Sequence, residues 1–446
     1  MAQVLGEHFT YKKLFKAVVP SILMMIFTSI YSVVDGVFVS NFVGASPFAG
    51  LNLIMPVIMI LGSIGFMMGT GGSALVAKTL GEGDEEKANK IFSMVIYFSA
   101  IAGIIISAIC FIFIEDIANA LGGNNATQET IKNSITYGRI LIAANFMFIL
   151  QNTFQAMFIA AEKPMLGFIV TVVAGITNMI LDAVFILVFK WGLVGAAVAT
   201  VMSYVVGGIV PIFYFISKKN NSLLKLVKTK IDFKAIWQSC FNGSSELLSN
   251  ISSSIVSMLF NMQLLKVAGD NGVAAYGIIM YLSFVFQAIF VGYAIGVAPI
   301  TSYNYGAENY LEVRNVLKKS LIVVSISGVV MTILTIGFAT PLSSLFTHGD
   351  KGLLDLTSSG MRLYGISFLL AGLNIYASSF FTSLNDGLVS AVISFARTLV
   401  FQVIAILVMP ILFGTTGIWL SIVVAEILAI IVSIVCLIVK KKKYRY

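Results

Sequence analysis

The sequence predicts an all-α polytopic membrane protein with twelve transmembrane helices, arranged as two pseudo-symmetric six-helix bundles. Three observations support this prediction. The chain is 58% hydrophobic and only 11% charged, which is too little charge to cover the surface of a soluble protein of 446 residues. Its apolar residues form runs of about 20 or more, long enough to cross a hydrocarbon core. The second half of the chain also repeats the first.

The apolar runs place the individual helices. Strand-like alternation is absent, so a membrane β-barrel is not expected. The first run extends to about Val43 and is too long for a cleavable signal, so we interpret it as a retained first span. We expect spans at residues 14–43, 50–79, 91–114, 134–160, 164–190, 192–217, 238–267, 271–302, 317–340, 360–384, 388–413 and 415–439.

Basic residues predict the orientation of these spans. Most of the 28 Lys and Arg residues fall in segments that share a side of the membrane with the N-terminus. The positive-inside rule therefore predicts that both termini are cytoplasmic, in a multi-pass protein of the cell (plasma or inner) membrane. No basic groove alternates with aromatic residues, so a nucleic-acid partner is not expected. Membrane lipids are the expected surroundings, and we interpret the basic tail as a stop-transfer anchor.

An internal repeat divides the chain into two lobes. Residues 43–89 align with residues 268–314 without a gap, and this alignment pairs Gly44 with Gly269. A second match pairs WGLVGAAVAT with FGTTGIWLSI, and so Gly192 with Gly414. The predicted parts are an N-terminal lobe, a basic cytoplasmic linker, a C-terminal lobe and a basic tail, at residues 1–217, 218–237, 238–439 and 440–446.

Each lobe has six spans, an even number, so the two repeats run in parallel. Two such lobes enclose a space near the middle of the membrane, and rocking one against the other gives alternating access. A channel does not need this arrangement. The repeat therefore favours a carrier, and a single chain with both lobes is expected to work as a monomer.

A few acidic residues lie inside the spans, where a charge costs at least ~2.5 kcal/mol and needs a reason. Counting 1.5 Å per residue from the outer ends places Asp35 and Asp182 about 12–14 Å below the outer surface, with Thr200 at the same depth. Asn178 and Tyr31 lie one helical turn from the two acids. These residues predict an oxygen-rich cluster that binds a proton or Na⁺.

The alternative for Asp35 and Asp182 is a static role in hydrogen bonds between helices. The repeat aligns Asp35 with Phe260 and places Asp182 near Ile406, so the second lobe is apolar where the first is acidic. A structural role common to both lobes should have kept acids in both. The difference therefore favours a functional role for the pair.

The second lobe has its own buried charges. We expect Arg397 and Glu426 to form an ion pair, which would leave Glu246 to bind a cationic substrate. Static packing is the alternative for Glu246.

Other polar and special residues support the first lobe. Asn152 and Gln155 are three residues apart on one face of a span, with Tyr137 near its outer end, so they line the central space or pack between helices. Pro20 predicts a bend and a hinge, because proline removes a backbone donor. The glycines of the segment GTGGSA indicate close helix packing, since no strand or Walker lysine accompanies them.

Over its whole length the chain resembles the multidrug and toxic compound extrusion (MATE) family. The resemblance rests on the two six-span repeats, the segment PSILMMIFTSIYSVVDGVFVSNFVG, the loop LGEGDEEKANK and the segment TNMILDAVFILVFKWGLVGAAVAT. The short ends and small loops are most similar to the bacterial MepA-like or DinF-like branch.

The resemblance implies roles for residues already singled out. Asp35, Asn178, Asp182 and Thr200 match the family's cation site in the first lobe. Pro20 matches its bending proline, and the positions that line or support the cavity are Tyr31, Tyr137, Asn152 and Gln155. Glu246 resembles an acid of the NorM-like branch, but residues 360–384 lack the second acid of that branch.

The sequence therefore predicts a multidrug efflux antiporter that exchanges amphipathic, mostly cationic organic compounds for H⁺ or Na⁺. We expect no cofactor, no resident metal and no enzyme activity, so an ion gradient supplies the energy. A lipid-linked sugar flippase is the main alternative, although its cavity should carry several basic residues to hold pyrophosphate. An intramembrane protease with an aspartyl dyad is a third, less favoured possibility.

Overall fold

The computed structural model describes residues 4–122, 126–347 and 350–446, and in these ranges it contains helices and no strands. The N-terminal lobe consists of η1 (Val4–Gly6), α1 (Tyr11–Phe38), η2 (Val39–Val43), α2 (Ala45–Gly81), α3 (Glu85–Ile112), α4 (Ile114–Gly122), α5 (Gln128–Ala160), α6 (Pro164–Asp182), η3 (Ala183–Val188), α7 (Gly192–Gly208) and α8 (Val210–Ile216). Its η1 is a short 3-10 turn, and η2 and η3 are π-helical turns.

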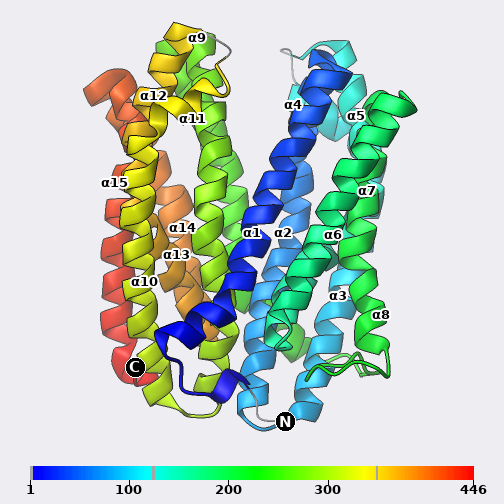
Figure 1. Ribbon diagram of the computed structural model, residues 1–446, viewed down its shortest axis with the longest axis vertical. Coiled ribbons are helices and arrows are strands. Elements are labelled where there is room, and N and C mark those ends of the chain that lie inside the picture. The colour runs from blue at the N-terminus through cyan, green and yellow to red at the C-terminus, as the bar shows by residue number, and fades with distance from the viewer. Residues whose placement is uncertain (1–3, 123–125, 348–349) are drawn as a thin grey trace.

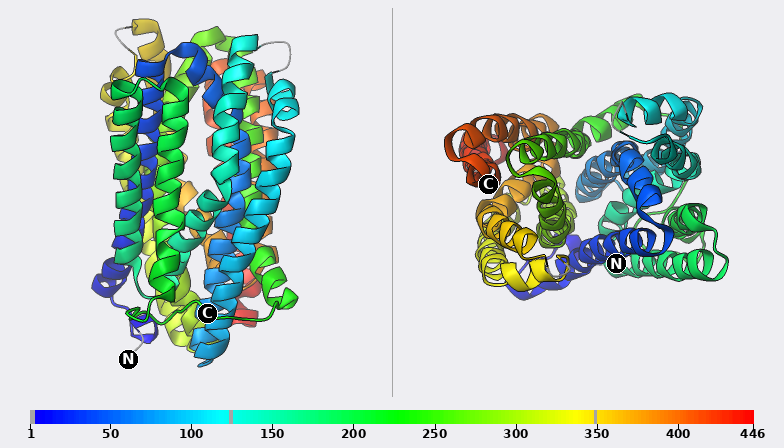
Figure 2. Two further views of the ribbon diagram at one scale, coloured as in Figure 1. Left: turned by 90° about the vertical axis from the view of Figure 1, so that its right-hand side faces the viewer. Right: turned by 90° about the horizontal axis from the view of Figure 1, so that it is seen from above.

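The C-terminal lobe consists of α9 (Phe233–Gly306), α10 (Tyr310–Gly337), α11 (Ala339–Ser344), α12 (Lys351–Gly365), α13 (Phe368–Ser383), α14 (Gly387–Phe395), the π-helical turn η4 (Ala396–Val400) and α15 (Phe401–Tyr444). Figure 1 shows both chain termini at the same end of the molecule, which we call the termini end. Seen from above in Figure 2, the early and late helices form two separate groups.

The number of spans agrees with the sequence prediction. Ten described helices are long and apolar enough to cross a membrane, and α12 and α13 form an eleventh span that is bent by 49°. The last of the ten, Gly387–Tyr444, is broken at Gly414, where the backbone leaves helical geometry, and so contains two spans. The span predicted at 360–384 is present, and residues 366–367 interrupt its helix between α12 and α13.

The internal repeat is visible in the backbone. Gly44 and Gly269 both have positive φ, 123° and 62°, and so do Gly192 and Gly414, at 56° and 55°. Residues with a side chain adopt such a conformation less readily, so glycine is favoured at each of these turns. The pairs that the sequence alignment matched therefore make matching turns in the two lobes, as an internal repeat requires.

The lobes touch each other in the half of the molecule near the termini end. A Cβ on Gly81 of α2 would collide with the carbonyl oxygen of Tyr303 in α9, and a Cβ on Gly306 of α9 would collide with the carbonyl of Lys78. Deeper in the membrane, a Cβ on Gly71 would likewise meet the carbonyl of Ser239. Only glycine permits backbones to approach so closely. The lobes diverge toward the opposite end in Figure 1.

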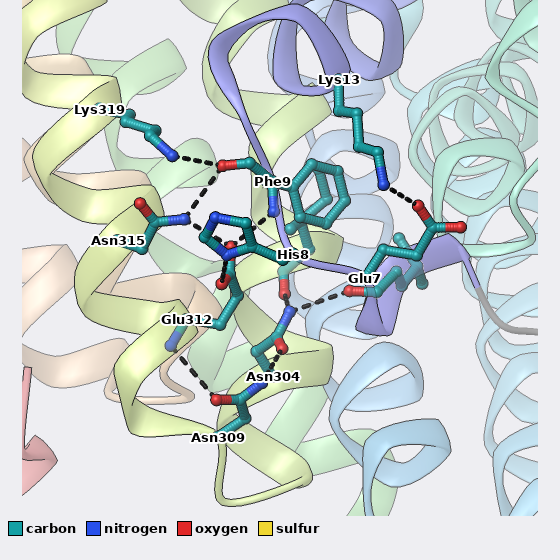
Figure 3. Close-up of polar contacts among 11 residues, drawn as sticks. Glu7, His8, Phe9, Lys13, Asn304, Asn309, Glu312, Asn315 and Lys319 are labelled. Carbon is teal, nitrogen blue, oxygen red and sulfur yellow. Dashed lines mark hydrogen bonds and ion pairs between the residues drawn. The ribbon is translucent and has the colours of Figure 1, made fainter.

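The segment before α1 ties the first lobe to the second. We call residues 5–10 the N-terminal strap (Figure 3). Its Leu5 and Phe9 side chains are buried in the core of the C-terminal lobe. The Glu312 carboxylate of α10 accepts hydrogen bonds from the Phe9 amide at 2.9 Å and the Asn315 amide at 2.7 Å, and it contacts the His8 ring at 2.7 Å. The strap therefore anchors α1 to the C-terminal lobe.

Candidate functional site

The two acids singled out in the first lobe lie together. Asp35 is on α1 and Asp182 ends α6, and these two helices pack against each other. Close packing is possible because Gly175 of α6 faces the rings of Phe27 and Tyr31, where a Cβ would collide. The carboxyl groups of Asp35 and Asp182 lie close enough to influence each other directly. The site is therefore assembled by the contact between α1 and α6.

These carboxyl groups lack hydrogen-bond donors. Asp182 is fully buried and Asp35 is partly buried. Among the described residues, neither oxygen of Asp182 has a hydrogen-bond partner, and the same holds for Oδ1 of Asp35. Two adjacent carboxylates cannot both be ionised cheaply, but a proton held between them removes one charge and supplies a donor. The arrangement is thus suited to take up a cation.

Neutral oxygens complete the cluster. The Asn178 amide, one turn before Asp182, donates to the Thr200 hydroxyl of α7 at 3.5 Å and lies near Asp35. Its own Oδ1 has no partner in the described part of the chain, nor does the Tyr137 hydroxyl, which lies near Thr200. Four helices, α1, α5, α6 and α7, therefore supply oxygen atoms to one cluster. Oxygen atoms are suitable ligands for Na⁺ and can also accept a proton.

The backbone is irregular at both acids. Helix α6 changes to the π-helical turn η3 directly after Asp182, and α1 changes to η2 four residues after Asp35. The amide of Val39, the first residue of η2, bonds back to the carbonyls of Asp35 and Gly36. Such π-helical turns are frequently found at functional sites. Neither turn was predicted, because apolar spacing does not distinguish a π-helical turn from an α-helix.

The two remaining candidates on α5, Asn152 and Gln155, face different neighbouring helices. The Asn152 amide donates to the carbonyl of Gly62 in α2 at 3.4 Å, so it serves a contact between helices. Gln155 instead faces a narrow crevice that it shares with Gln151 and with Thr171 of α6. Both polar atoms of the Gln155 side chain have no partner among the described residues. Gln155 therefore retains its full hydrogen-bonding capacity.

The sequence did not single out Gln151 or Tyr204, although both lie close to residues of the acid cluster. Tyr31 lies close to Gln151 of α5, and Tyr204 of α7 lies close to both Tyr31 and Asp35. Tyr204 follows Thr200 by four residues and therefore lies on the same face of α7. Gln151 follows Tyr137 by four helical turns, which also places it on the same face. Helical spacing from the residues already chosen could have found both.

Pro20 lies inside α1, which remains helical from Tyr11 to Phe38. On either side of the proline, α1 packs closely against α9: a Cβ on Gly292 would collide with the backbone of Ile22, and a Cβ on Gly296 would press against Val18. Pro20 is therefore located where α1 touches the other lobe. The hinge itself stays a prediction.

Two buried charges of the C-terminal lobe, Arg397 and Glu426, form an ion pair. The Arg397 Nε donates to both oxygens of Glu426, at 2.8 and 3.0 Å, and its terminal nitrogen adds a contact at 2.8 Å. Asn374 donates to the same carboxylate at 2.7 Å and accepts from Ser433 at 2.8 Å. The predicted Arg397–Glu426 ion pair is confirmed. Glu246 of α9 is partly buried and feels the positive charge of Arg397.

Comparison with known proteins places this geometry in context. The family model MatE matches residues 20–184 and 247–408. A curated relative from Staphylococcus haemolyticus (strain JCSC1435), named Multidrug export protein MepA, is 27% identical over 427 residues, which cover 94% of this chain and 92% of the relative.

Two solved structures have the same fold. One is described as the outward-facing conformation of a multidrug resistance MATE family transporter of the MOP superfamily; it has a TM-score of 0.92 and 22% identity, and the match covers 99% of this chain and 98% of that one. The other, a MOP superfamily transporter from Pyrococcus furiosus Vc1 (DSM3638), is described as having a binding pocket of reverse polarity that suggests a different function. It has a TM-score of 0.91 and 22% identity, covering 100% of this chain and 98% of that one.

Proposed function

The chain belongs to the MATE family, and on that premise we propose that it exports amphipathic, mostly cationic organic compounds in exchange for H⁺ or Na⁺. It is a multi-pass transporter of the cell membrane and not an enzyme. The observation that carries the proposal is the Asp35–Asp182 pair, two adjacent carboxyl groups with three oxygens that lack donors among the described residues. Uptake of one cation between them relieves the repulsion that their charges would otherwise create.

The coupling follows from differential binding. A cation shifts the balance between two conformations only as far as it binds one of them more tightly. The acids belong to α1 and α6, and α1 also touches the C-terminal lobe around Pro20 and through the strap. Neutralising Asp35 therefore changes the helix that contacts both lobes. In the proposed cycle, the cation enters from outside and favours release of the exported compound, and the return step releases the cation inside.

The orientation in this cycle rests on the basic residues. With both termini in the cytoplasm, the half in which Gly81 and Gly306 bring the lobes together faces the cytoplasm. The described conformation is then closed inside, with the lobes diverging toward the exterior (Figure 1). We propose that Tyr31, Tyr137 and Gln155 contact substrate or support the site from α1 and α5, and that a monomer carries out the exchange without a cofactor.

The alternative of a lipid-linked sugar flippase is disfavoured by one contact. Such a transporter needs free basic side chains within the membrane to hold pyrophosphate. Arg397, the one basic residue that the sequence places deep within a span, is bound to Glu426 through both of its oxygens. It is therefore already neutralised.

The test is ethidium efflux from proteoliposomes under an imposed pH gradient and, separately, an imposed Na⁺ gradient. We expect Asp35→Asn and Asp182→Asn each to reduce gradient-driven efflux at least about 100-fold, because a neutral amide cannot exchange the cation. Asp355→Asn is the matched control, since Asp355 is an exposed acid on α12. Efflux at the wild-type rate by a properly inserted Asp35→Asn variant would refute the proposal.

A further inference from the structure

A second polar site lies at the termini end and contains none of the residues of the acid cluster. A cavity of about 760 Å³ opens between the ends of α2 and α3, the segment 228–232 that joins the lobes, and the first turns of α9. Its wall is rich in basic side chains, namely Lys78, Lys87, Lys90, Lys228, Lys230 and Lys234. Two acids, Glu82 and Asp232, face the same space. The proposed export mechanism uses none of these residues.

The positive charge of this cavity is only partly neutralised. Lys78 pairs with Glu82 at 3.6 Å, and Lys90 pairs with Glu86 at 2.5 Å. Oδ1 of Asp232 accepts the backbone amides of Lys234 and Ala235, at 2.9 and 3.2 Å, and so caps the start of α9. Within the described part of the chain, no ion pair engages the four remaining ammonium groups, those of Lys87, Lys228, Lys230 and Lys234.

The walls of the cavity are fixed in place. The segment that joins the lobes lies along α3, where the Lys225 amide donates to Asn89 at 2.6 Å and the Val227 amide donates to Ser93 at 2.9 Å. The Asp232 amide also contacts the Met94 sulfur at 3.1 Å. The lysines of this segment are therefore held opposite Lys87 and Lys90 of α3 before any ligand binds.

Exposed aromatic side chains of α9 lie beside the cavity. Phe233 is 78% exposed and Trp237 is 70% exposed, although both are large and apolar. Trp237 stacks on Phe241 at 6.4 Å, and the spacing of four places all three rings on one face of α9. The neighbouring face carries Lys234 and Gln238 into the cavity. Exposed aromatic rings beside lysines are typical of the boundary between lipid headgroups and acyl chains.

We propose that this cavity binds the phosphate-bearing headgroup of an anionic phospholipid from the adjacent leaflet, with the acyl chains against Phe233 and Trp237. Four unpaired ammonium groups complement a phosphodiester, and basic pockets on the cytoplasmic side bind lipid phosphates in this way. The exposed rings favour a lipid over a soluble phosphate, because a soluble anion leaves them uncovered. The bound lipid touches α2 and α3 of one lobe and α9 of the other, so it braces the closed end of the molecule.

The experiment is native mass spectrometry of the full-length protein in detergent, titrated with phosphatidylglycerol or with phosphatidylcholine of identical acyl chains. We expect phosphatidylglycerol to bind at least about tenfold more tightly than phosphatidylcholine. The variant K87Q/K228Q/K230Q/K234Q should lose this preference. The control K218Q/K219Q/K441Q/K442Q removes the same charge from the termini end outside the cavity and should keep it. The double variant K228Q/K230Q changes only exposed positions and should lose part of the preference. It keeps the test valid if the fourfold variant does not fold.

Three outcomes would overturn the proposal. If phosphatidylglycerol and phosphatidylcholine bind with equal affinity, the cavity does not select an anionic headgroup. Equal loss of preference in the cavity variant and in the control variant indicates general electrostatic attraction. Binding of inorganic pyrophosphate with the same affinity as phosphatidylglycerol, abolished by the same four substitutions, assigns the cavity to a soluble anion instead of a lipid.

Discussion

In the N-terminal lobe the carboxyl groups of Asp35 and Asp182 face each other, and three of their oxygens lack a donor among the described residues, whereas in the C-terminal lobe Glu426 is bonded by both Arg397 and Asn374. The repeat aligns Asp35 with Phe260 and places Asp182 near Ile406, and both of these second-lobe residues are fully buried in its core. The same architecture therefore folds without acids at these positions.

This difference separates two uses of a buried acid. A carboxylate that accepts an ion pair and an amide is neutralised and holds helices together, so its removal costs stability. A carboxylate without donors is unfavourable in the folded protein and is retained for another reason, here proposed to be cation exchange. The comparison leads to predictions about stability as well as about transport.

The largest stability effect is expected in the C-terminal lobe. Arg397→Leu leaves Glu426 buried without its counter-charge, which typically costs about 3–5 kcal/mol, and the melting temperature in detergent should fall accordingly. Arg397→Leu combined with Glu426→Leu should recover most of the loss, because neither charge then remains buried. In contrast, Asp182→Asn should leave the melting temperature unchanged or raise it. A fall as large as that of Arg397→Leu would show that the two lobes use their acids alike.

The contact between the lobes should give the next largest effect. Gly81→Ala and Gly306→Ala each drive a methyl group into a backbone carbonyl of the other lobe, and overpacking of this kind costs about 1–3 kcal/mol. Because the strain exists only while the termini end is closed, each variant should also increase alkylation of a cysteine placed at that interface. Gly277→Ala is the control, since a Cβ there meets open space. Equal alkylation in all three variants would contradict the assignment of this contact as the closed end.

A smaller effect is expected at the N-terminal strap. Glu312→Gln weakens charge-assisted hydrogen bonds from the Phe9 amide and Asn315, at a cost of about 1–3 kcal/mol in unfolding free energy. The control is Glu7→Gln, which removes an exposed ion pair with Lys13 and should cost at most about 1 kcal/mol. Thermal unfolding of the two variants side by side measures the difference. If Glu7→Gln destabilises as much as Glu312→Gln, the strap is not anchored through Glu312.

Much of the fold could be predicted from sequence because the membrane imposes a simple rule. Each apolar run must be helical and span-length, so the twelve spans and the repeat follow from apolar residues and glycines. The break between α12 and α13 could not be seen in this way, since residues 360–384 stay apolar through it. Several helices also begin before the apolar run, as α9 does at Phe233, because helical hydrogen bonding continues into the headgroup region.

The part of the candidate site that depends only on the depth of a residue along its span could be predicted from the sequence. Asp35, Asp182 and Thr200 share a level, and the structure brings them into one cluster with Asn178 and Tyr137. Depth does not give the rotation of a helix about its axis. For that reason Asn152 and Gln155 were expected on one face, although Asn152 contacts α2 and Gln155 faces α6.

The most direct test of cation exchange at Asp35 and Asp182 is the equilibrium binding of ethidium to the purified protein at varied pH and varied Na⁺. Ligands that compete through one site must each change the affinity of the other by the same factor. The wild-type Kd should change about tenfold or more across the titration of one of the two cations. The Kd of Asp35→Asn/Asp182→Asn should change with neither, and that of Asp355→Asn should follow the wild type. A double variant that keeps the wild-type dependence on pH or Na⁺ would contradict cation exchange at these two acids.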